Sequence, residues 1–403
     1  MFIPDNISHV LSRLRDAGYE AYTVGGCVRD TLLGLVPHDW DVCTSALPHE
    51  TEAVFSELRC IETGIRHGTV TVLSGGVNVE VTTFRRDGIY LDGRRPENVT
   101  FTTSLTEDLS RRDFTCNAMA WDGAGTIIDP FRGQDDLRQG ILRCVGDPVT
   151  RFREDALRIL RALRFASRFG FSLDSETAAA VHDERELLHK IAQERVYSEL
   201  CGIISAPHAA SVLPSYQDVL SVVLPESEAL SSEEFSRRLM GMQGLPEGVA
   251  LRFSALLRDP ISANSAMLRL RADNLTRRTV VSLCDSLTRP LPATRPQLRR
   301  LVAALGPSLS TDALLLFRSY AVSDSELLDV ERSRVLLSDI LSCDTCFSVR
   351  DLAVDGQALL SVGAEQGPSL GRLLSALLDA VFDERCPNDT AALLAYARRL
   401  LSK

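Results

Sequence analysis

The spacing of apolar residues along the chain changes near residue 137. Before that point, short β-branched runs such as TVTVLSGGVNVEVTTF (69–84) and NVTFTT (98–103) alternate with short helical stretches. After it, apolar residues recur at helical spacing almost throughout, beginning with RFREDALRILRALRFASRFGF (151–171). We therefore expect an α+β fold, with an N-terminal head containing a small mixed sheet followed by an all-helical neck, body and tail.

Proline-containing breaks interrupt the helical part of the chain. They are APH at 206, LPES at 224, LPEG at 245 and PLPATRP at 290. At 403 residues the chain is also too long for one compact core. We expect four parts, which are a head at 1–137, a helical neck at 138–205, a helical body at 206–310 and a helical tail at 311–403.

Composition narrows the class of protein. The net charge of -10 argues against a basic coat for unspecific nucleic-acid binding, although it does not exclude a local basic groove. No apolar run is long enough to span a bilayer, and the first residues lack the pattern of a secretory signal. Ten cysteines without framework spacing suit a reducing compartment. We expect a cytoplasmic protein that does not contact a membrane.

A glycine pair follows the first predicted strand. Gly25 and Gly26 come after AYTV (21–24) and open the helical stretch CVRDTLLG. Unpaired N–H groups at a helix N-terminus can face an anion, and the missing side chains let a phosphate approach closely. Arg29, one turn into the helix, could reach the same phosphates. Taken alone, a Gly-Gly pair before a helix is more often a plain turn.

Two aspartates follow the glycine turn at a short distance. Asp39 and Asp41 are two residues apart, so on a strand they would project to the same side. Carboxylates that close repel each other unless a cation lies between them, and Mg²⁺ takes one or two protein carboxylates together with substrate phosphates. Glu80, in the alternating run NVEVTTF, is the candidate for a third carboxylate, with a solvent-facing strand residue as the alternative.

Six motifs, in their order and spacing, resemble the class II tRNA nucleotidyltransferases, the CCA-adding enzymes, within the polymerase-β-like nucleotidyltransferase superfamily. They are VGGCVRDTLLG…HDWDVCT, GTVTV…VEVTTFR, DGRRPENVTF, DLSRRDFTCNAMA, IIDPFRGQDDLRQGILR and RFREDALRILRALRFASRFGF. The resemblance is close from residue 20 to about 200 and returns near the C-terminus in VDGQALLSVGAEQGPSLGRLL and CPNDTAALLAYA. Between 206 and 340 only generic helix matches.

The resemblance implies that protein side chains recognise the incoming base in place of a nucleic-acid template. The corresponding residues here are Glu154, Asp155 and Arg158. Asp155 and Arg158 are three apart, so in one helix they would share a face. An aspartate accepts from the exocyclic amine of cytosine or adenine, and an arginine donates to the neighbouring ring nitrogen or carbonyl, which leaves U and G mismatched. Without the resemblance, the pair reads as an i,i+3 salt bridge on a helix surface.

Four further residues acquire nucleotide-binding roles through the same resemblance. Arg112 and Asp113 of RRDFTCNA resemble the residues that meet the phosphate and the ribose of the nucleotide. Arg161 and Arg164 continue the spacing of Arg158 and resemble contacts to the triphosphate and the base.

Two elements resemble mechanical parts of the family. The segment DPFRGQDDL (129–137) resembles the element that joins head to neck, where a hinge could change the pocket from C to A specificity. Glu194 and Arg195 resemble a motif that stiffens the neck, and they also read as charges at the start of a helix.

We therefore expect an enzyme that adds C, C and A to the 3′ end of tRNA from CTP and ATP, without a nucleic-acid template, by two-metal nucleotidyl transfer with release of pyrophosphate. Asp39, Asp41 and Glu80 are the catalytic candidates, and Asp39 and Asp41 would hold Mg²⁺. The tail would bind tRNA by shape and backbone. The sequence does not reveal the oligomeric state, and a homodimer is one state that it allows.

Four alternatives compete with full CCA addition. An enzyme that adds only A keeps the loop after the second carboxylate strand and is not excluded by the sequence. A bacterial poly(A) polymerase shares the head but usually carries basic extensions that are missing here, and a CC-only enzyme would lack the loop RRDGIYLDGRRPEN (85–98). A catalytically inactive RNA-binding relative would be expected to lose an aspartate of the metal pair, and both are present.

Overall fold

The computed structural model describes residues 3–88 and 99–402. Most of the loop at 85–98 that argues against a CC-only enzyme lies outside the described residues. Backbone contacts divide the chain into two compact units, Met1–Ala229 and Leu230–Lys403. The first unit holds the predicted head and neck and the start of the predicted body, so the four-part division stays a prediction.

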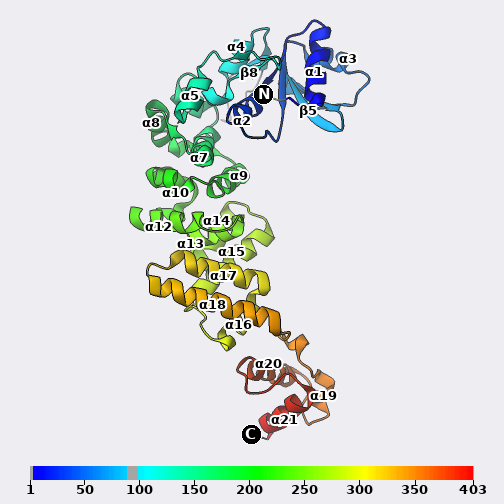
Figure 1. Ribbon diagram of the computed structural model, residues 1–403, viewed down its shortest axis with the longest axis vertical. Helices are drawn as coiled ribbons and strands as arrows, with labels where there is room; N and C mark the ends of the chain where they lie inside the picture. The colour runs from blue at the N-terminus through cyan, green and yellow to red at the C-terminus, as the bar shows by residue number, and fades with distance from the viewer. Residues whose placement is uncertain (1–2, 89–98, 403) are drawn as a thin grey trace. The chain divides into compact units, whose positions relative to one another are not determined.

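A seven-stranded mixed sheet forms the centre of the head (Figure 1). Its strands lie in the order β3–β4–β5–β2–β1–β8–β9, and the pair β2–β5 is parallel while the other pairs are antiparallel. The strands are β1 (Ala21–Val24), β2 (Asp41–Thr44), β3 (Cys60–Gly64), β4 (Thr69–Ser74), β5 (Val77–Thr83), β8 (Ala120–Trp121) and β9 (Ile127–Ile128). The predicted small mixed sheet is confirmed.

Alternating apolar residues fix which face of the sheet is buried. Val70 and Val72 of β4 and Val79 and Val81 of β5 all point into one core. Helices α1 (Asp5–Asp16) and α3 (Pro48–Val54) cover that core, and α1 contributes Ile7, Val10, Leu11 and Leu14 at helical spacing. Helix α2 (Gly26–Leu32) follows β1, and α4 (Leu105–Ser110) lies beside the hairpin of β6 (Arg85–Asp87) and β7 (Val99–Phe101).

Helices make up most of the rest of the first unit. They are α5 (Gly133–Gln139), α6 (Pro148–Glu154), α7 (Leu157–Phe169), α8 (Ser175–Asp183), α9 (Gln193–Ile204), α10 (Ala209–Val212) and α11 (Gln217–Val223), with a short pair of strands, β10 (Ile141–Leu142) and β11 (Ser172–Leu173). Local signals set their ends: the side chain of Asp147 caps α6 by accepting from the backbone N–H of Thr150, and Gly170 ends α7 with a φ of 70°. Helix α7 packs against α9 and buries Ile159, Leu160 and Leu163.

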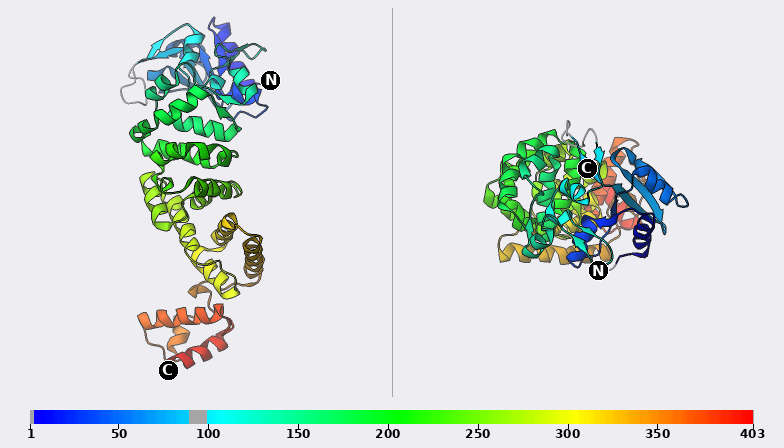
Figure 2. Two further views of the ribbon diagram at one scale, coloured as in Figure 1. Left: turned by 90° about the vertical axis from the view of Figure 1, so that its left-hand side faces the viewer. Right: turned by 90° about the horizontal axis from the view of Figure 1, so that it is seen from above.

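The second unit is helical throughout the part that the structure describes. Its helices are α12 (Ser232–Gln243), α13 (Val249–Leu257), α14 (Pro260–Arg269), α15 (Asn274–Leu287), α16 (Arg295–Leu305), α17 (Pro307–Tyr320), α18 (Asp324–Cys343), α19 (Gly356–Leu360), α20 (Pro368–Phe382) and α21 (Thr390–Leu401). Helices α20 and α21 lie side by side (Figures 1 and 2) and share a small core with α19, built on Leu359, Leu377 and Leu393. The predicted α+β head followed by helices is confirmed.

The sequence predicts that no apolar segment is long enough to span a bilayer. Among the described residues, no single helix is both long and apolar enough to cross a bilayer. The bent pair Arg295–Leu305 and Pro307–Tyr320 meets both criteria only when its two halves are taken together.

Candidate active site

The glycine turn lies where the predicted strand meets the predicted helix. Strand β1 ends at Val24 and α2 begins at Gly26. Between them Gly25 has φ 82° and ψ −129°, a region that residues with a Cβ rarely adopt. An ideal Cβ on Gly25 would lie only 2.9 Å from Nη1 of Arg112. The missing side chain therefore allows both the turn and the close approach of the Arg112 guanidinium.

The two aspartates are not on one strand, which corrects that prediction. Asp41 is the first residue of β2, whereas Asp39 lies before it in irregular backbone. On one side of β2, Val24 of β1 pairs with Asp41 and β1 then ends at the positive-φ turn of Gly25, whereas β5 on the other side extends back to Val77. No β1 backbone remains for Asp39 to pair with.

Asp39, Asp41 and Glu80 nevertheless line one cavity of about 560 Å³. Asp41 of β2 and Glu80 of β5 are register partners on adjacent parallel strands, so their side chains share a face of the sheet. Asp41 is exposed at this cavity, but the surrounding protein still removes part of the water near its carboxyl. This desolvation raises the pKa of Asp41, the charges of Glu80 and Asp39 raise it further, and Arg112 opposes the shift.

The carboxylates fit a cation that is completed by its substrate. Within 3–88 and 99–402, no three His, Cys, Asp or Glu side chains are placed to hold a metal ion by themselves. Mg²⁺ does not need such a cage, because it commonly binds one or two carboxylates together with substrate phosphates and water. Asp39 and Asp41, with their mutual repulsion and their hard oxygen donors, suit that mode of binding.

A second cavity, of about 270 Å³, brings together half of the predicted nucleotide-binding residues. Its lining combines five arginines and two aspartates from the head, from the junction between α6 and α7, and from helices α7 and α9. The lining residues are Arg111, Arg112, Asp113, Asp155, Leu157, Arg158, Arg161 and Arg195. Such a mixture of fork-shaped donors and carboxylate acceptors can bind both phosphate and the edge of a base.

The backbone at Asp155 departs from the predicted continuous helix. Helix α6 ends at Glu154, Asp155 is extended (φ −140°, ψ 103°), and α7 begins at Leu157. The Asp155 carboxylate accepts from the backbone N–H of Leu157 at 3.1 Å, a local bond that competes with helix continuation. Asp155 and Arg158 therefore do not share a face of one helix, although both line the second cavity.

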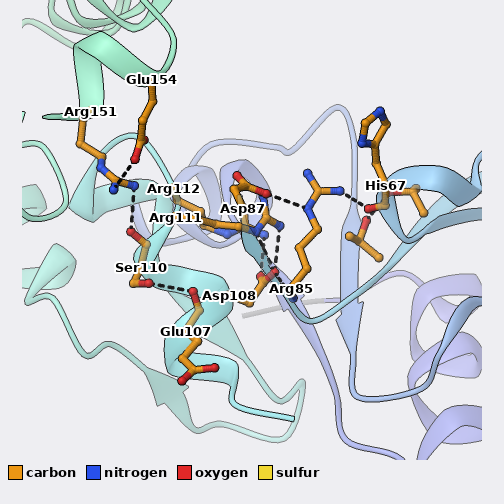
Figure 3. A network of polar contacts seen from close by, with 12 residues as sticks. His67, Arg85, Asp87, Glu107, Asp108, Ser110, Arg111, Arg112, Arg151 and Glu154 are labelled. Carbon is orange, nitrogen blue, oxygen red and sulfur yellow. Dashed lines mark hydrogen bonds and ion pairs between the residues drawn. The ribbon is translucent and has the colours of Figure 1, made fainter. Parts of the chain in front are cut away.

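Each member of the predicted base-reading motif has a protein partner. The Oδ2 atom of Asp155 accepts from Nη2 of Arg195 at 2.8 Å. Arg158, only 9% exposed, donates from Nη1 to Glu154 at 2.6 Å and from Nη2 to the carbonyl of Arg111 at 3.0 Å. Glu154 also pairs with Arg151, which reaches the head (Figure 3).

Arg161 and Arg164 have different surroundings. Arg161 donates from Nε and Nη2 to Oδ2 of Asp113, at 2.9 and 2.5 Å. Burial alone would raise the pKa of Asp113, but the charge of Arg161 and a hydrogen bond from Asn117 hold that pKa below its usual range. Arg164 pairs instead with Glu199 of α9 at 2.6 Å and does not line the second cavity.

Arg29 lies away from both cavities. Its side chain is buried, with 4% exposed, and its guanidinium lies over the rings of Phe165 and Phe169 at 5.0 and 4.9 Å. Nη1 donates to Asn117 Oδ1 at 2.5 Å, and Asn117 in turn donates to Asp113 at 3.0 Å. The structure does not bring Arg29 to a phosphate site, but it links Arg29 to Asp113 through Asn117.

Three lining residues of the second cavity were not predicted as nucleotide contacts. Arg111 directly precedes Arg112, so the doubled arginine of RRD was an available signal. Leu157 carries no polar group that would single it out. Arg195 lies 40 positions from Asp155 in the chain, and only the tertiary packing of α9 on α7 brings it there.

Replacing Gly25 with alanine tests the glycine turn, with Gly34→Ala as the matched control. Both residues have positive φ, 82° and 73°, but nothing lies within 4 Å of a Cβ on Gly34. We expect Gly34→Ala to lower the free energy of unfolding by about 1–2 kcal/mol. Gly25→Ala should cost about 1–3 kcal/mol more, because its Cβ displaces Arg112, and only this variant should weaken CTP binding. Urea unfolding and equilibrium CTP binding measure both effects; equal CTP affinity in the two variants would contradict the role of the close approach.

Comparison with known proteins covers almost the whole chain. Residues 21–143 match the family described as the poly A polymerase head domain, 170–229 the RNA and SrmB-binding site of polymerase A, and 315–397 tRNA nucleotidyltransferase domain 2. The CCA-adding enzyme of Geobacillus thermodenitrificans is 38% identical over 96% of this chain and 95% of its own. That of Lactobacillus helveticus is 36% identical, covering 97% and 96%.

The chain belongs to the CCA-adding enzyme family. Its fold agrees with the crystal structure of the Bacillus stearothermophilus CCA-adding enzyme in complex with CTP, with a TM-score of 0.82, 31% identity and coverage of 100% and 98% of the two chains. The predicted family and the prediction of an enzyme are thus confirmed. The likeness to CCA-adding enzymes also extends through 206–340, where the motifs alone matched only generic helix. Nucleotidyltransferases of this family generally depend on divalent metal ions.

Proposed function

We propose that this CCA-adding enzyme adds C, C and A in turn to the 3′ end of tRNA, using CTP and ATP and no nucleic-acid template. One observation supports the proposal most strongly. Arg112 lines the cavity that holds Asp155 and Arg158, lies over the glycine turn, and acts electrostatically on Asp41 in the carboxylate cavity. A nucleotide with its base in one cavity would thus have its phosphates beside the carboxylates.

The proposed reaction joins the 3′ oxygen of tRNA to the α-phosphorus of the nucleotide. The bond from the α-phosphorus to the bridging oxygen breaks, and pyrophosphate leaves. Arg112 and the N–H groups of the glycine turn bind the phosphates. Asp39 and Asp41 would hold Mg²⁺, which supplies neutralisation of charge at the reacting phosphate. Glu80, beside Asp41 on β5, orients the 3′ hydroxyl and accepts its proton.

Base selection is assigned to Asp155 and Arg158. A carboxylate has about four lone-pair sites, so Asp155 can accept from an exocyclic amine while it keeps its bonds from Leu157 and Arg195. Cytosine and adenine both carry such an amine, and uracil does not. Arg158 lines the same cavity, and its planar guanidinium is held there by Glu154 and by the carbonyl of Arg111. Arg161 holds Asp113 in place for the ribose. Arg29 and Arg164 lie outside the second cavity and stabilise the residues around it.

The remaining assignments concern partners and location. The tail at 311–403 is proposed to bind tRNA, supported by the match of 315–397 to tRNA nucleotidyltransferase domain 2. We place the protein in the cytoplasm, with ten free cysteines that suit a reducing compartment. A homodimer stays a proposal about the state of assembly.

Addition of single nucleotides to defined tRNA ends tests the function. The substrates are tRNAs that end before the first C, after C and after CC, each incubated with CTP alone, ATP alone or both. We expect CTP to complete CC on the first two, ATP to extend only the third, and both together to complete CCA on all. Extension of only the CC-ending tRNA would identify an A-only enzyme, and long runs of A would identify a poly(A) polymerase.

A further inference from the structure

Asp108 is a fully buried carboxylate that contacts both arginines of the RRD motif and the backbone of strand β6. It lies in α4 and is 0% exposed. Its Oδ1 accepts from the backbone N–H of Arg85 at 3.2 Å and from Nε and Nη2 of Arg111 at 3.0 and 2.8 Å. Its Oδ2 lies 3.5 Å from Nη2 of Arg112 (Figure 3).

The two oxygens of Asp108 have different environments. Oδ1 is saturated by three donors, whereas Oδ2 is buried and has no hydrogen-bond partner among the described residues. A buried carboxylate oxygen is costly unless a positive charge compensates it, and Arg112 is the cation beside it. Asp108 is also the strongest of the charges that raise the pKa of Arg112 against the effect of burial.

Arg112 is held by charge more than by hydrogen-bond geometry. The Asp108–Arg112 distance of 3.5 Å is that of an ion pair, and the Nε atom of Arg112 is likewise buried without a hydrogen-bond partner among the described residues. On its other side the guanidinium lies over Gly25. A guanidinium in this state is fixed in place but keeps hydrogen-bonding capacity for an anion at the turn.

We propose that Asp108 is a positioning residue that holds the Arg112 guanidinium over the glycine turn, where the nucleotide triphosphate binds. This inference rests on the assignment of Arg112 to the phosphates in the proposed function. Because the triphosphate is common to CTP and ATP, the loss of Asp108 weakens both nucleotides alike. A purely structural ion pair would affect the stability of the fold and leave the affinity of the folded protein unchanged.

A double-mutant cycle separates these roles. Asp108→Asn, Arg112→Ala and the double variant are compared by equilibrium binding of CTP and ATP, at a temperature below the unfolding transition of each. We expect Asp108→Asn to weaken CTP and ATP about tenfold each, Arg112→Ala to weaken them at least as much, and the double variant to bind no more weakly than Arg112→Ala. Glu107→Gln is the matched control, because Glu107 neighbours Asp108 in α4 but pairs with the more exposed Arg86.

The outcomes distinguish the phosphate assignment of Arg112 from the positioning role of Asp108. Unchanged affinity in Arg112→Ala would overturn the phosphate assignment and the inference with it. A loss in Arg112→Ala together with wild-type affinity in Asp108→Asn, or with additive effects in the double variant, would overturn the inference alone. If Asp108→Asn does not fold, Asp108→Glu takes its place, since it keeps the charge but moves the carboxylate by one methylene. An equal, non-additive loss for both nucleotides supports the inference, and wild-type binding overturns it.

Discussion

Replacing Asp41 with asparagine should lower nucleotide transfer by at least about 1,000-fold, the scale of loss expected when a charged group that acts in the transition state is removed. The substitution keeps the shape of the side chain but removes the charge that attracts a divalent cation next to Glu80 and Asp39. The affinity for tRNA should change less than about twofold, because the tail is proposed to bind RNA. Single-turnover incorporation of CTP and equilibrium tRNA binding measure the two quantities.

Asp16→Asn is the control for the Asp41 variant, since Asp16 is an exposed carboxylate of the same unit at the end of α1. It should leave turnover unchanged. If Glu80 acts on the tRNA hydroxyl, Glu80→Gln should lower turnover and leave nucleotide affinity nearly unchanged. Wild-type incorporation by Asp41→Asn would remove the assignment of the cation to this cavity.

Replacing Asp155 with alanine should relax the choice of nucleotide. An exocyclic amine then lacks its acceptor, and a good bidentate base contact is worth about 1–3 kcal/mol, so discrimination against UTP and GTP should fall about tenfold to a hundredfold. The measurement is single-nucleotide addition to tRNA ending in CC, with ATP, CTP, GTP and UTP compared for wild type and variant.

The ion pair between Asp155 and Arg195 requires its own control, because Asp155→Ala also releases Arg195 into the cavity. Arg195→Met removes the pair but keeps the carboxylate, so it should slow the reaction with less effect on the order of nucleotide preference. An Asp155→Ala enzyme that is slower but has unchanged preference ratios would show that Asp155 serves only to hold α9 against the α6–α7 junction.

Local patterns in the sequence predicted those features that depend on neighbouring residues. The β-branched run of 69–84 predicted strand structure, which the structure places in β4 and β5, and the apolar strand before Gly25 predicted the turn. Glu80, the predicted third carboxylate, lies on β5, the strand next to β2, and is the register partner of Asp41. These features follow from the period-2 alternation of strands and from the conformational freedom of glycine. Both signals depend on only a few consecutive residues.

Two of the three errors involve partners that are distant in the chain. Asp39 lies outside β2, beyond the point where β1, one of its two partner strands, ends, and the residues around Asp39 do not encode that end. Apolar periodicity continues through Asp155, so the junction between α6 and α7 is invisible to a pattern-based prediction even though the Asp155 side chain helps to form it. Arg29 turns inward because Phe165 offers it an aromatic face, and that contact spans more than a hundred residues of sequence.

The junction at Asp155 also bears on how the proposed base-reading site could accept both a pyrimidine and a purine. Had Asp155 and Arg158 lain on one helix, the helical rise would fix their separation once and for all. Asp155 is itself the extended residue between α6 and α7, so rotation about its backbone changes the distance between its carboxylate and the guanidinium of Arg158 while both helices stay intact. A nucleic-acid template specifies the next base by advancing one nucleotide. A protein template does not advance, so only the distance between its acceptor and its donor can change when the incoming base changes from a pyrimidine to a purine.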